Sequence, residues 1–229
     1  MRVSAIVPAA GSSRRMGGGL EKPYRLLRRK PLLVYSLLTL EQTSWVNEII
    51  LLVAHRRLSL TRRILKRYRF RKIRGVYSGG KTRSESVSRG LFRVDPRADF
   101  VLVHDGARPL LRPGLLRRVM RQAQKSGAAI PALPVTPTIK EVTPGQVVVR
   151  TLSRPGLWEV QTPQIFRRAF LAEAFRRLSR QTEKATDCAA LVERTGRRVT
   201  VVLGDPMNLK VTTPMDLIVA EALLKKYRR

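Results

Sequence analysis

The sequence contains a single cysteine and no long apolar run. Because Cys188 stands alone among 229 residues, an intrachain disulfide framework and a zinc site built on several thiolates are both excluded. No segment approaches the roughly 18 consecutive apolar residues that span a bilayer, and the residues after Met1 do not have the pattern of a signal peptide. We therefore expect a soluble protein of the cytoplasm that has no membrane partner.

Acidic residues are scarce, which leaves a strong positive charge. Lys and Arg total 46 against 16 Asp and Glu, a formal net charge of +30 at pH 7. Such a charge favours polyanionic partners, namely RNA, DNA, anionic lipid or phosphorylated small molecules. The basic residues are spread along the whole chain, however, and aromatic side chains on which bases could stack make up only 6%. Solvated helix faces without a specific nucleic-acid partner are the simpler interpretation, and a basic RNA-binding protein is the alternative of another class.

Short apolar runs alternate with helical patterns along most of the chain. Runs at 3–7, 48–54, 72–77, 100–103, 128–135 and 198–203 predict buried strands. Helices are predicted at 31–40, 83–94, 113–125, 167–179, 186–193 and 213–227. A basic amphipathic stretch that follows the run at 48–54 and extends to about residue 70 predicts one more. This order is typical of an α/β fold, and we expect a single Rossmann-like domain over residues 1–229, with a mostly parallel sheet flanked by helices.

Residues 138–152 break the alternation. Thr138–Val142 and Val147–Leu152 predict two strands around a Pro144-Gly145 turn, with no helix between them. A lone two-stranded unit is marginally stable in water. We therefore expect this inserted β-hairpin arm, about residues 136–156, to pack on a second copy of the chain and to form a homodimer.

Small residues and cations follow the first predicted strand. The segment reads Pro8-Ala9-Ala10-Gly11-Ser12-Ser13-Arg14-Arg15-Met16-Gly17, and Lys22-Pro23 comes shortly after it. In an open parallel sheet, ligands bind beyond the carboxyl ends of the strands, where exposed backbone N–H groups can bind phosphate oxygens. The loop matches neither the P-loop nor the G-x-G-x-x-G pattern. By itself it indicates either a phosphate site or a flexible surface turn.

Four further segments, together with this loop, carry a specific resemblance. They are Gly79–Val87 (GGKTRSESV), Val103–Pro109 (VHDGARP), Leu157–Gln164 (LWEVQTPQ) and Asn208–Pro214 (NLKVTTP). In this order, and over essentially the full chain, they resemble the 2-C-methyl-D-erythritol 4-phosphate cytidylyltransferase family. The resemblance implies transfer of CMP from CTP to a sugar-alcohol phosphate in isoprenoid precursor biosynthesis, with release of pyrophosphate. A ribitol-5-phosphate cytidylyltransferase on the same scaffold is the nearest alternative.

The resemblance also implies roles for individual residues. Arg15 and Lys22 would stabilise the transition state, while Arg154 and Lys210 would position the acceptor phosphate. The nucleotide would contact Pro8, Ala9, Ala10, Gly11, Gly80, Arg83, Ser86 and Asp105, and the acceptor would contact Arg108, Thr138 and Thr162.

One carboxylate in this set is also the expected metal ligand. Asp105 ends a predicted buried strand and would bind a divalent cation, usually Mg²⁺, unless it only caps the following segment. His104 beside it is expected to be a structural residue. Cys188 stands where relatives usually carry an acid, and we expect it to have a packing role.

Overall fold

A computed structural model of the chain describes residues 1–11, 21–178 and 185–227. Its centre is an eight-stranded sheet of order β10-β7-β11-β6-β1-β4-β5, with β12 paired to β7. The strands are β1 (Val3–Ala9), β4 (Glu48–Val53), β5 (Ile73–Ser78), β6 (Phe100–Val103), β7 (Ala128–Pro134), β10 (Trp158–Val160), β11 (Gln164–Arg167) and β12 (Thr200–Leu203). The sequence predicted the mostly parallel sheet, which is confirmed.

Two strands of the sheet run against the others and were not predicted. β11 pairs antiparallel with both β6 and β7, and β10 pairs antiparallel with β7. The remaining neighbours in the sheet, β1 with β4 and β6, β4 with β5, and β12 with β7, are parallel. The chain between β7 and β11 therefore returns along the sheet without a crossover helix.

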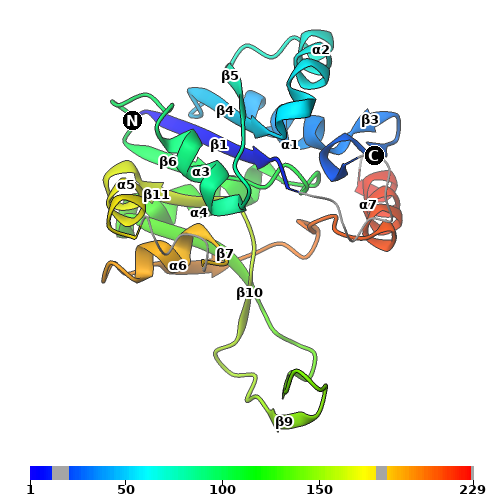
Figure 1. Cartoon of the computed structure of the whole chain (residues 1–229), viewed down its shortest axis with the longest axis vertical. Coiled ribbons are helices and arrows are strands. Elements are labelled where there is room, and N and C mark those ends of the chain that lie inside the picture. The colour runs from blue at the N-terminus through cyan, green and yellow to red at the C-terminus, as the bar shows by residue number, and fades with distance from the viewer. Residues whose placement is uncertain (12–20, 179–184, 228–229) are drawn as a thin grey trace.

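Helices cover both faces of the sheet (Figure 1). α1 (Leu32–Gln42), α2 (Leu58–Tyr68) and α4 (Pro113–Ser126) pack on one face, where Ala5 and Val7 of β1 point. α3 (Arg83–Leu91), α5 (Arg168–Arg177) and α6 (Cys188–Glu193) pack on the other, where Ile6 points. Because both faces are buried, the central strands read as continuous apolar runs in the sequence.

The C-terminal helix α7 (Pro214–Tyr227) packs apart from these two layers. Ala220 and Leu224 of α7 join Leu27, Leu32 and Tyr35 in a third apolar cluster. Leu27 belongs to a short hairpin of β2 (Leu26–Leu27) and β3 (Lys30–Pro31) that leads into α1. None of the helices in the described ranges is long and apolar enough to cross a membrane.

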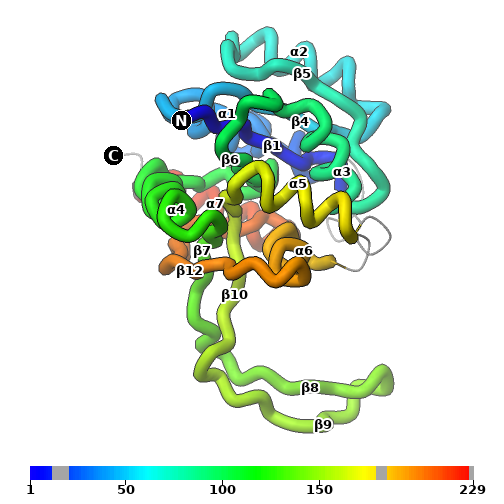
Figure 2. The backbone as a smooth tube through the Cα atoms, turned by 90° about the vertical axis from the view of Figure 1, so that its left-hand side faces the viewer, coloured from blue at the N-terminus to red at the C-terminus, as the bar shows by residue number. Residues whose placement is uncertain are grey.

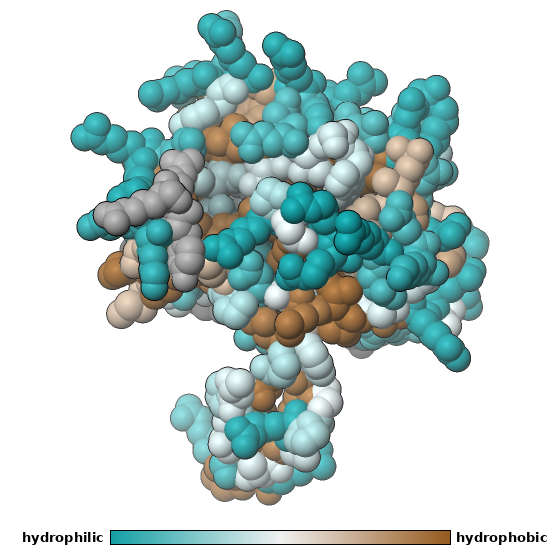
Figure 3. Space-filling model, turned by 180° about the vertical axis from the view of Figure 1, so that it is seen from behind, coloured by the Kyte–Doolittle hydropathy of each residue, from teal (hydrophilic) through white to brown (hydrophobic). Residues whose placement is uncertain are grey.

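A hairpin arm leaves the body of the molecule, as the sequence predicted. β8 (Lys140–Val142) and β9 (Val148–Thr151) form a separate two-stranded sheet. Figures 1 and 2 show it away from the body, at the end of two extended segments. Its valines are exposed, Val147 to 66% of its surface. Figure 3 shows further apolar side chains where the arm joins the body.

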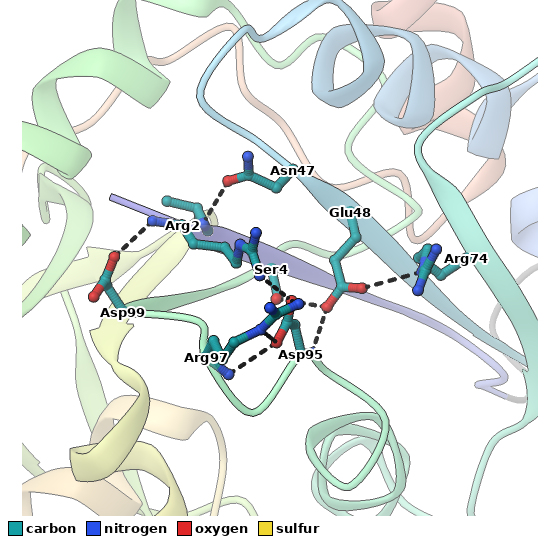
Figure 4. Close-up of polar contacts among 9 residues, drawn as sticks. Arg2, Ser4, Asn47, Glu48, Arg74, Asp95, Arg97 and Asp99 are labelled. Atoms are coloured by element: carbon teal, nitrogen blue, oxygen red, sulfur yellow. Dashed lines mark hydrogen bonds and ion pairs between the residues drawn. The ribbon is translucent and has the colours of Figure 1, made fainter.

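At the amino ends of the strands, a polar network joins β1, β4 and β5 (Figure 4). Glu48 is buried, at 8% exposure. Its Oε1 accepts hydrogen bonds from Ser4 Oγ and from the backbone N–H of Asp95, both at 2.6 Å. Its Oε2 lies 3.7 Å from Arg74 Nε. Asp95 in turn binds Arg2 Nη1 at 2.6 Å. These contacts fix one end of the sheet and leave the carboxyl ends of the strands open.

Candidate active site

The segments that follow β1, β5 and β6 meet at the carboxyl edge of the sheet, because these strands are parallel. They surround a cavity of about 220 Å³. All the predicted nucleotide contacts line it, namely Pro8, Ala9, Ala10, Gly11, Gly80, Arg83, Ser86 and Asp105. Lys22 and Lys210 line it as well. The structure therefore brings these residues together in one place, and their contacts with a nucleotide stay a prediction.

The small residues of this cavity are needed for close packing of its two loops. A Cβ on Gly79 would lie 2.4 Å from the Cβ of Ala10 and 2.8 Å from Ser86 Oγ. Ser86 Oγ accepts the backbone N–H of Gly80 at 2.9 Å. Thr82 caps the start of α3 by accepting the N–H of Glu85 at 3.0 Å. The amino end of α3, with its partial positive charge, therefore faces the same edge of the sheet.

Asp105 lies at the centre of the charged groups. It is 6% exposed, and its Oδ1 accepts from Arg83 Nε at 2.8 Å while its Oδ2 accepts from Lys210 Nζ at 2.7 Å. Burial raises the pKa of Asp105, but the positive charges of Arg83 and Lys210 outweigh it and hold the pKa well below its usual range. The group is a carboxylate at any physiological pH. Its negative charge in turn raises the pKa of Arg83, although burial alone would lower it.

A second cavity of about 230 Å³ adjoins the first. The two share Arg83, Asp105 and Lys210, and the second adds Arg108 and Thr162. Arg108 is buried, and its Nη1 donates to the backbone carbonyl of Asn208 at 2.6 Å. Among the described residues, Arg83 Nη2 and Arg108 Nε have no hydrogen-bond partner. Buried N–H donors of this kind are expected to be satisfied by a bound group, and guanidinium donors suit a phosphate.

The family model for 2-C-methyl-D-erythritol 4-phosphate cytidylyltransferase matches residues 3–226. The chain belongs to this family. It is 45% identical to the 2-C-methyl-D-erythritol 4-phosphate cytidylyltransferase of Syntrophus aciditrophicus, over 98% of this chain and 97% of that one. The corresponding protein of Alkaliphilus metalliredigens is 42% identical, over 98% and 94%.

Solved structures from the cytidylyltransferase family have the same fold. The crystal structure of 4-diphosphocytidyl-2C-methyl-D-erythritol synthase from Anaerococcus prevotii superposes with a TM-score of 0.85 at 33% identity, over 97% of this chain and 96% of that chain. The enzyme from Thermus thermophilus superposes with a TM-score of 0.78 at 34% identity, over 98% and 100%. Both matches include nearly the whole of each chain, so the fold class is confirmed.

Two residues expected from the family resemblance, Thr138 and Arg154, line neither of the two cavities. Both belong to the arm. Arg15 falls outside the described residues. Arg154 is exposed, and its Nη1 donates to the carbonyl of Thr136 at 2.6 Å. The roles of Thr138 and Arg154 therefore stay predictions that require a second copy of the chain.

His104 and Cys188 are buried, as their predicted structural roles require. His104 Nδ1 lies 2.9 Å from Thr162 Oγ1, and its Nε2 lies 3.4 Å from the carbonyl of Arg108. Burial lowers the pKa of His104 to about 4, so the ring is neutral. Cys188 Sγ lies 3.5 Å from Arg83 Nη1, and burial raises the pKa of the thiol. Cys188 thus packs against a residue of the site without being an activated nucleophile.

The sequence did not reveal two residues that support the second cavity. Asn208 is buried, and its Nδ2 donates to the carbonyl of Thr162 at 2.7 Å. Gln161 receives the backbone N–H of Asp205 on its Oε1 at 3.2 Å. Both stand within the segments that carry the family resemblance, which was the available signal. Their function is to join segments about 45 residues apart in the sequence, as the contact between Asn208 and Thr162 shows.

The donor set fits a magnesium ion that is held mainly by phosphates. No group of three or more His, Cys, Asp or Glu side chains that could enclose a metal lies within the described residues. Asp105 is the one acidic side chain that both cavities share. Each of its oxygens accepts one hydrogen bond and keeps a lone pair. Mg²⁺ is commonly bound by one or two carboxylates together with substrate phosphates and water.

Proposed function

We propose that the chain transfers CMP from CTP to 2-C-methyl-D-erythritol 4-phosphate in the cytoplasm, forming 4-diphosphocytidyl-2-C-methyl-D-erythritol and pyrophosphate. Family membership supports the reaction class. The observation that carries the proposal is the pair of adjoining cavities that share Arg83, Asp105 and Lys210. One cavity has the small-residue backbone that a nucleotide needs, and the other has Arg108 beside it for a second phosphate. A transfer between two phosphorylated substrates requires this adjacency.

In the proposed reaction, an oxygen of the acceptor phosphate attacks the α-phosphorus of CTP, and the bond from that phosphorus to the pyrophosphate oxygen breaks. The attacking oxygen is already ionised, so no general base is required. The neutral, buried His104 agrees with this, since it does not line either cavity. Catalysis then depends on position and on positive charge near the phosphorus, as in other phosphoryl-transfer enzymes.

Individual side chains would have the following roles in this reaction. Lys22, together with Arg15, would stabilise the charge that develops on the oxygens of the α-phosphate. Arg108, Thr162 and Lys210 would hold the acceptor phosphate, since they line the second cavity. Asp105 orients Arg83 and Lys210 by accepting a hydrogen bond from each. Asp105 would also hold Mg²⁺, which when bound supplies positive charge to the nucleotide phosphates.

We further propose a homodimer in which the arm of one copy reaches the site of the other. The isolated hairpin buries little of its own apolar surface, and association would cover it. Arg154 and Thr138 would then contact the acceptor bound to the neighbouring copy.

Pyrophosphate release is the test of the proposed reaction. The protein is incubated with Mg²⁺ and CTP, with either 2-C-methyl-D-erythritol 4-phosphate or ribitol 5-phosphate as acceptor. ATP, GTP and UTP replace CTP as controls. We expect release with CTP and the methylerythritol phosphate, and little with the other combinations. Faster release with ribitol 5-phosphate would assign the alternative acceptor, and no release with either would contradict the proposed reaction.

A further inference from the structure

The residue directly before Lys22 is a buried acid whose charge is fully paired. Glu21 is 6% exposed. Its Oε1 accepts from Arg56 Nε at 2.8 Å, and its Oε2 accepts from Arg57 Nε. Both arginines lie in the single 3-10 turn η3 (His55–Arg57), which follows β4. The arginines outweigh the effect of burial and lower the pKa of Glu21. Glu21 therefore stays a carboxylate and holds the start of its segment against η3.

The other side of Lys22 is tied to the same part of the chain. Lys22 opens the 3-10 turn η2 (Lys22–Tyr24), which the N–H of Tyr24 closes by donating to the carbonyl of Glu21 at 2.9 Å. Tyr24 is buried, and its hydroxyl lies 2.7 Å from Thr61 Oγ1 of α2. The guanidinium of Arg57 lies over the ring of Tyr24, 5.7 Å from its centre. Side chains on both sides of Lys22 are thus anchored to residues 56–61.

We propose that Glu21, held by Arg56 and Arg57, is a positioning residue that sets where Lys22 meets the transferred phosphate. Glu21 itself lines neither cavity, so its effect on the reaction would pass through Lys22. The proposal rests on the role proposed above for Lys22. A lysine side chain has four rotatable bonds, and the position of its ammonium depends on a fixed backbone. Misplacement of a catalytic group by about 1 Å can lower a rate on the order of a hundredfold.

The positive charges of Arg56 and Arg57 also require a carboxylate at position 21. Without Glu21, the guanidinium groups of Arg56 and Arg57 would face each other beside a turn that carries another cation. Like charges repel, and screening by water is reduced at Arg57, whose side chain is 26% exposed. The turn would then shift away from η3, and Lys22 would move with it. A neutral residue of the same shape should reproduce the packing of Glu21 but not this charge balance.

The test is the Glu21→Gln variant, which keeps the shape of the side chain and removes its charge. We expect kcat for CMP transfer to fall roughly tenfold, while KM for CTP changes by less than about twofold. Glu48→Gln is the matched control. It removes the charge of another buried, arginine-paired carboxylate at the opposite end of the sheet, and it should lower the unfolding temperature without changing kcat. An unchanged kcat in Glu21→Gln would overturn the proposal.

A double-mutant cycle shows whether Glu21 acts through Lys22. In a Lys22→Ala background, adding Glu21→Gln should lower kcat by less than about twofold, because the group being positioned is already gone. The same loss as in the wild-type background would contradict the positioning role. If Lys22→Ala alone were fully active, the proposed role of Lys22 would be wrong, and the positioning role of Glu21, which rests on it, would be overturned with it.

A second variant tests the positioning of Lys22 if Glu21→Gln does not fold. Tyr24→Phe removes only the hydroxyl that contacts Thr61, at the other side of Lys22. Circular dichroism establishes that the variant is folded under the assay conditions. We expect a smaller fall in kcat than in Glu21→Gln, about threefold, again with KM for CTP little changed. An unchanged kcat in a folded Tyr24→Phe variant would contradict anchoring of the turn as the cause.

Discussion

His104 and Asp105 are neighbours in the sequence and are both buried, but their surroundings keep His104 neutral and Asp105 charged. Asp105 keeps its charge because Arg83 and Lys210 bind its two oxygens. His104 has no such acid bound to its ring, and burial lowers its pKa to about 4. Among the described residues that line the first cavity, Asp105 is therefore the one acidic side chain beside several basic ones.

The neutral state of His104 makes the stability of the protein depend on pH. In the unfolded chain the pKa of histidine is about 6.5, above the folded value of about 4. The unfolded state therefore binds more protons between these values, and stability is lost as pH falls. We expect the free energy of unfolding to decrease by roughly 2 kcal/mol from pH 7.5 to pH 5 through this residue. Urea unfolding at the two pH values measures the change.

The His104→Gln variant isolates this contribution from that of the carboxylates. It keeps polar atoms near Thr162 but has no titratable ring. We expect its free energy of unfolding to fall by roughly 2 kcal/mol less than that of the wild type between pH 7.5 and pH 5. Equal losses in the two proteins would show that His104 does not remain neutral in the folded state.

Asp105→Asn removes the negative charge that Arg83 and Lys210 share. An amide is a poorer ligand for Mg²⁺ and leaves the two cations without their counter-charge. We expect a higher Mg²⁺ concentration for half-maximal activity and a kcat/KM lower by roughly a hundredfold. A magnesium titration of initial rates measures both. Chelation of divalent cations should abolish the activity of the wild type, and an unaltered magnesium requirement in the variant would count against Asp105 as a ligand.

At the scale of elements, the apolar runs predicted the central strands well. β1, β4 and β6 begin at the predicted residues, because a strand buried on both faces has apolar residues at most of its positions. The helix predicted to Val94 ends earlier, at Leu91. β10 and β11 were missed for a physical reason. They are only 3 and 4 residues long, and their pairing with distant strands leaves no local pattern in the sequence.

The site was predicted to a similar degree. The loop after β1 and Asp105, which lies just beyond β6, could be placed together, since the ends of parallel strands share an edge. The contact between Arg108 and Asn208, 100 residues apart, had no such basis. Nor did the pairing of Glu21 with Arg56 and Arg57, because a 3-10 turn after β4 has no periodic signal. Side-chain contacts between loops depend on the folded geometry.

The network around Glu48 gives a prediction about stability without a change in activity. Glu48→Ala removes the acceptor for Ser4 Oγ and for the N–H of Asp95, and the partner of Arg74. Buried groups left without a partner cost roughly 1–3 kcal/mol. We expect a loss of about that size in the free energy of unfolding, measured in urea, with kcat and KM for CTP unchanged. A loss below about 0.5 kcal/mol would show that water replaces the network.

At the scale of the whole molecule, the arm is the feature that the isolated chain does not explain. Its valines are exposed, and Arg154 at its base lines neither of the two cavities at the carboxyl edge of its own copy. If Arg154 acts on the neighbouring copy while Lys22 acts on its own, Lys22→Ala and Arg154→Ala homodimers should each be nearly inactive. A mixed dimer would have both lesions in one site and none in the other. Co-refolding equal amounts should restore activity to about one quarter of the wild-type value.

Subunit exchange must be shown in the same mixture, for example by differently tagged copies that purify together. Random pairing makes about half of the dimers mixed, each with one of its two sites intact, which gives the expected quarter. A mixture that exchanges subunits and stays inactive would contradict a shared site and would return Arg154 to the chain that carries it. Size-exclusion chromatography of Val147→Asp should in addition show more monomer, since this valine is 66% exposed on the arm.

Fixed positive charge in the cavity at the carboxyl edge is proposed to stabilise the transferred phosphate. The most direct measurement is kcat for CMP transfer in Lys22→Ala beside the dissociation constant of CTP from calorimetry. Lys66→Ala, at an exposed position of α2, is the control. We expect kcat to fall by a factor on the order of a hundred to a thousand, with CTP binding changed less than about fivefold and the control unaffected. Near-normal turnover in Lys22→Ala, or a loss confined to CTP binding, would contradict the account.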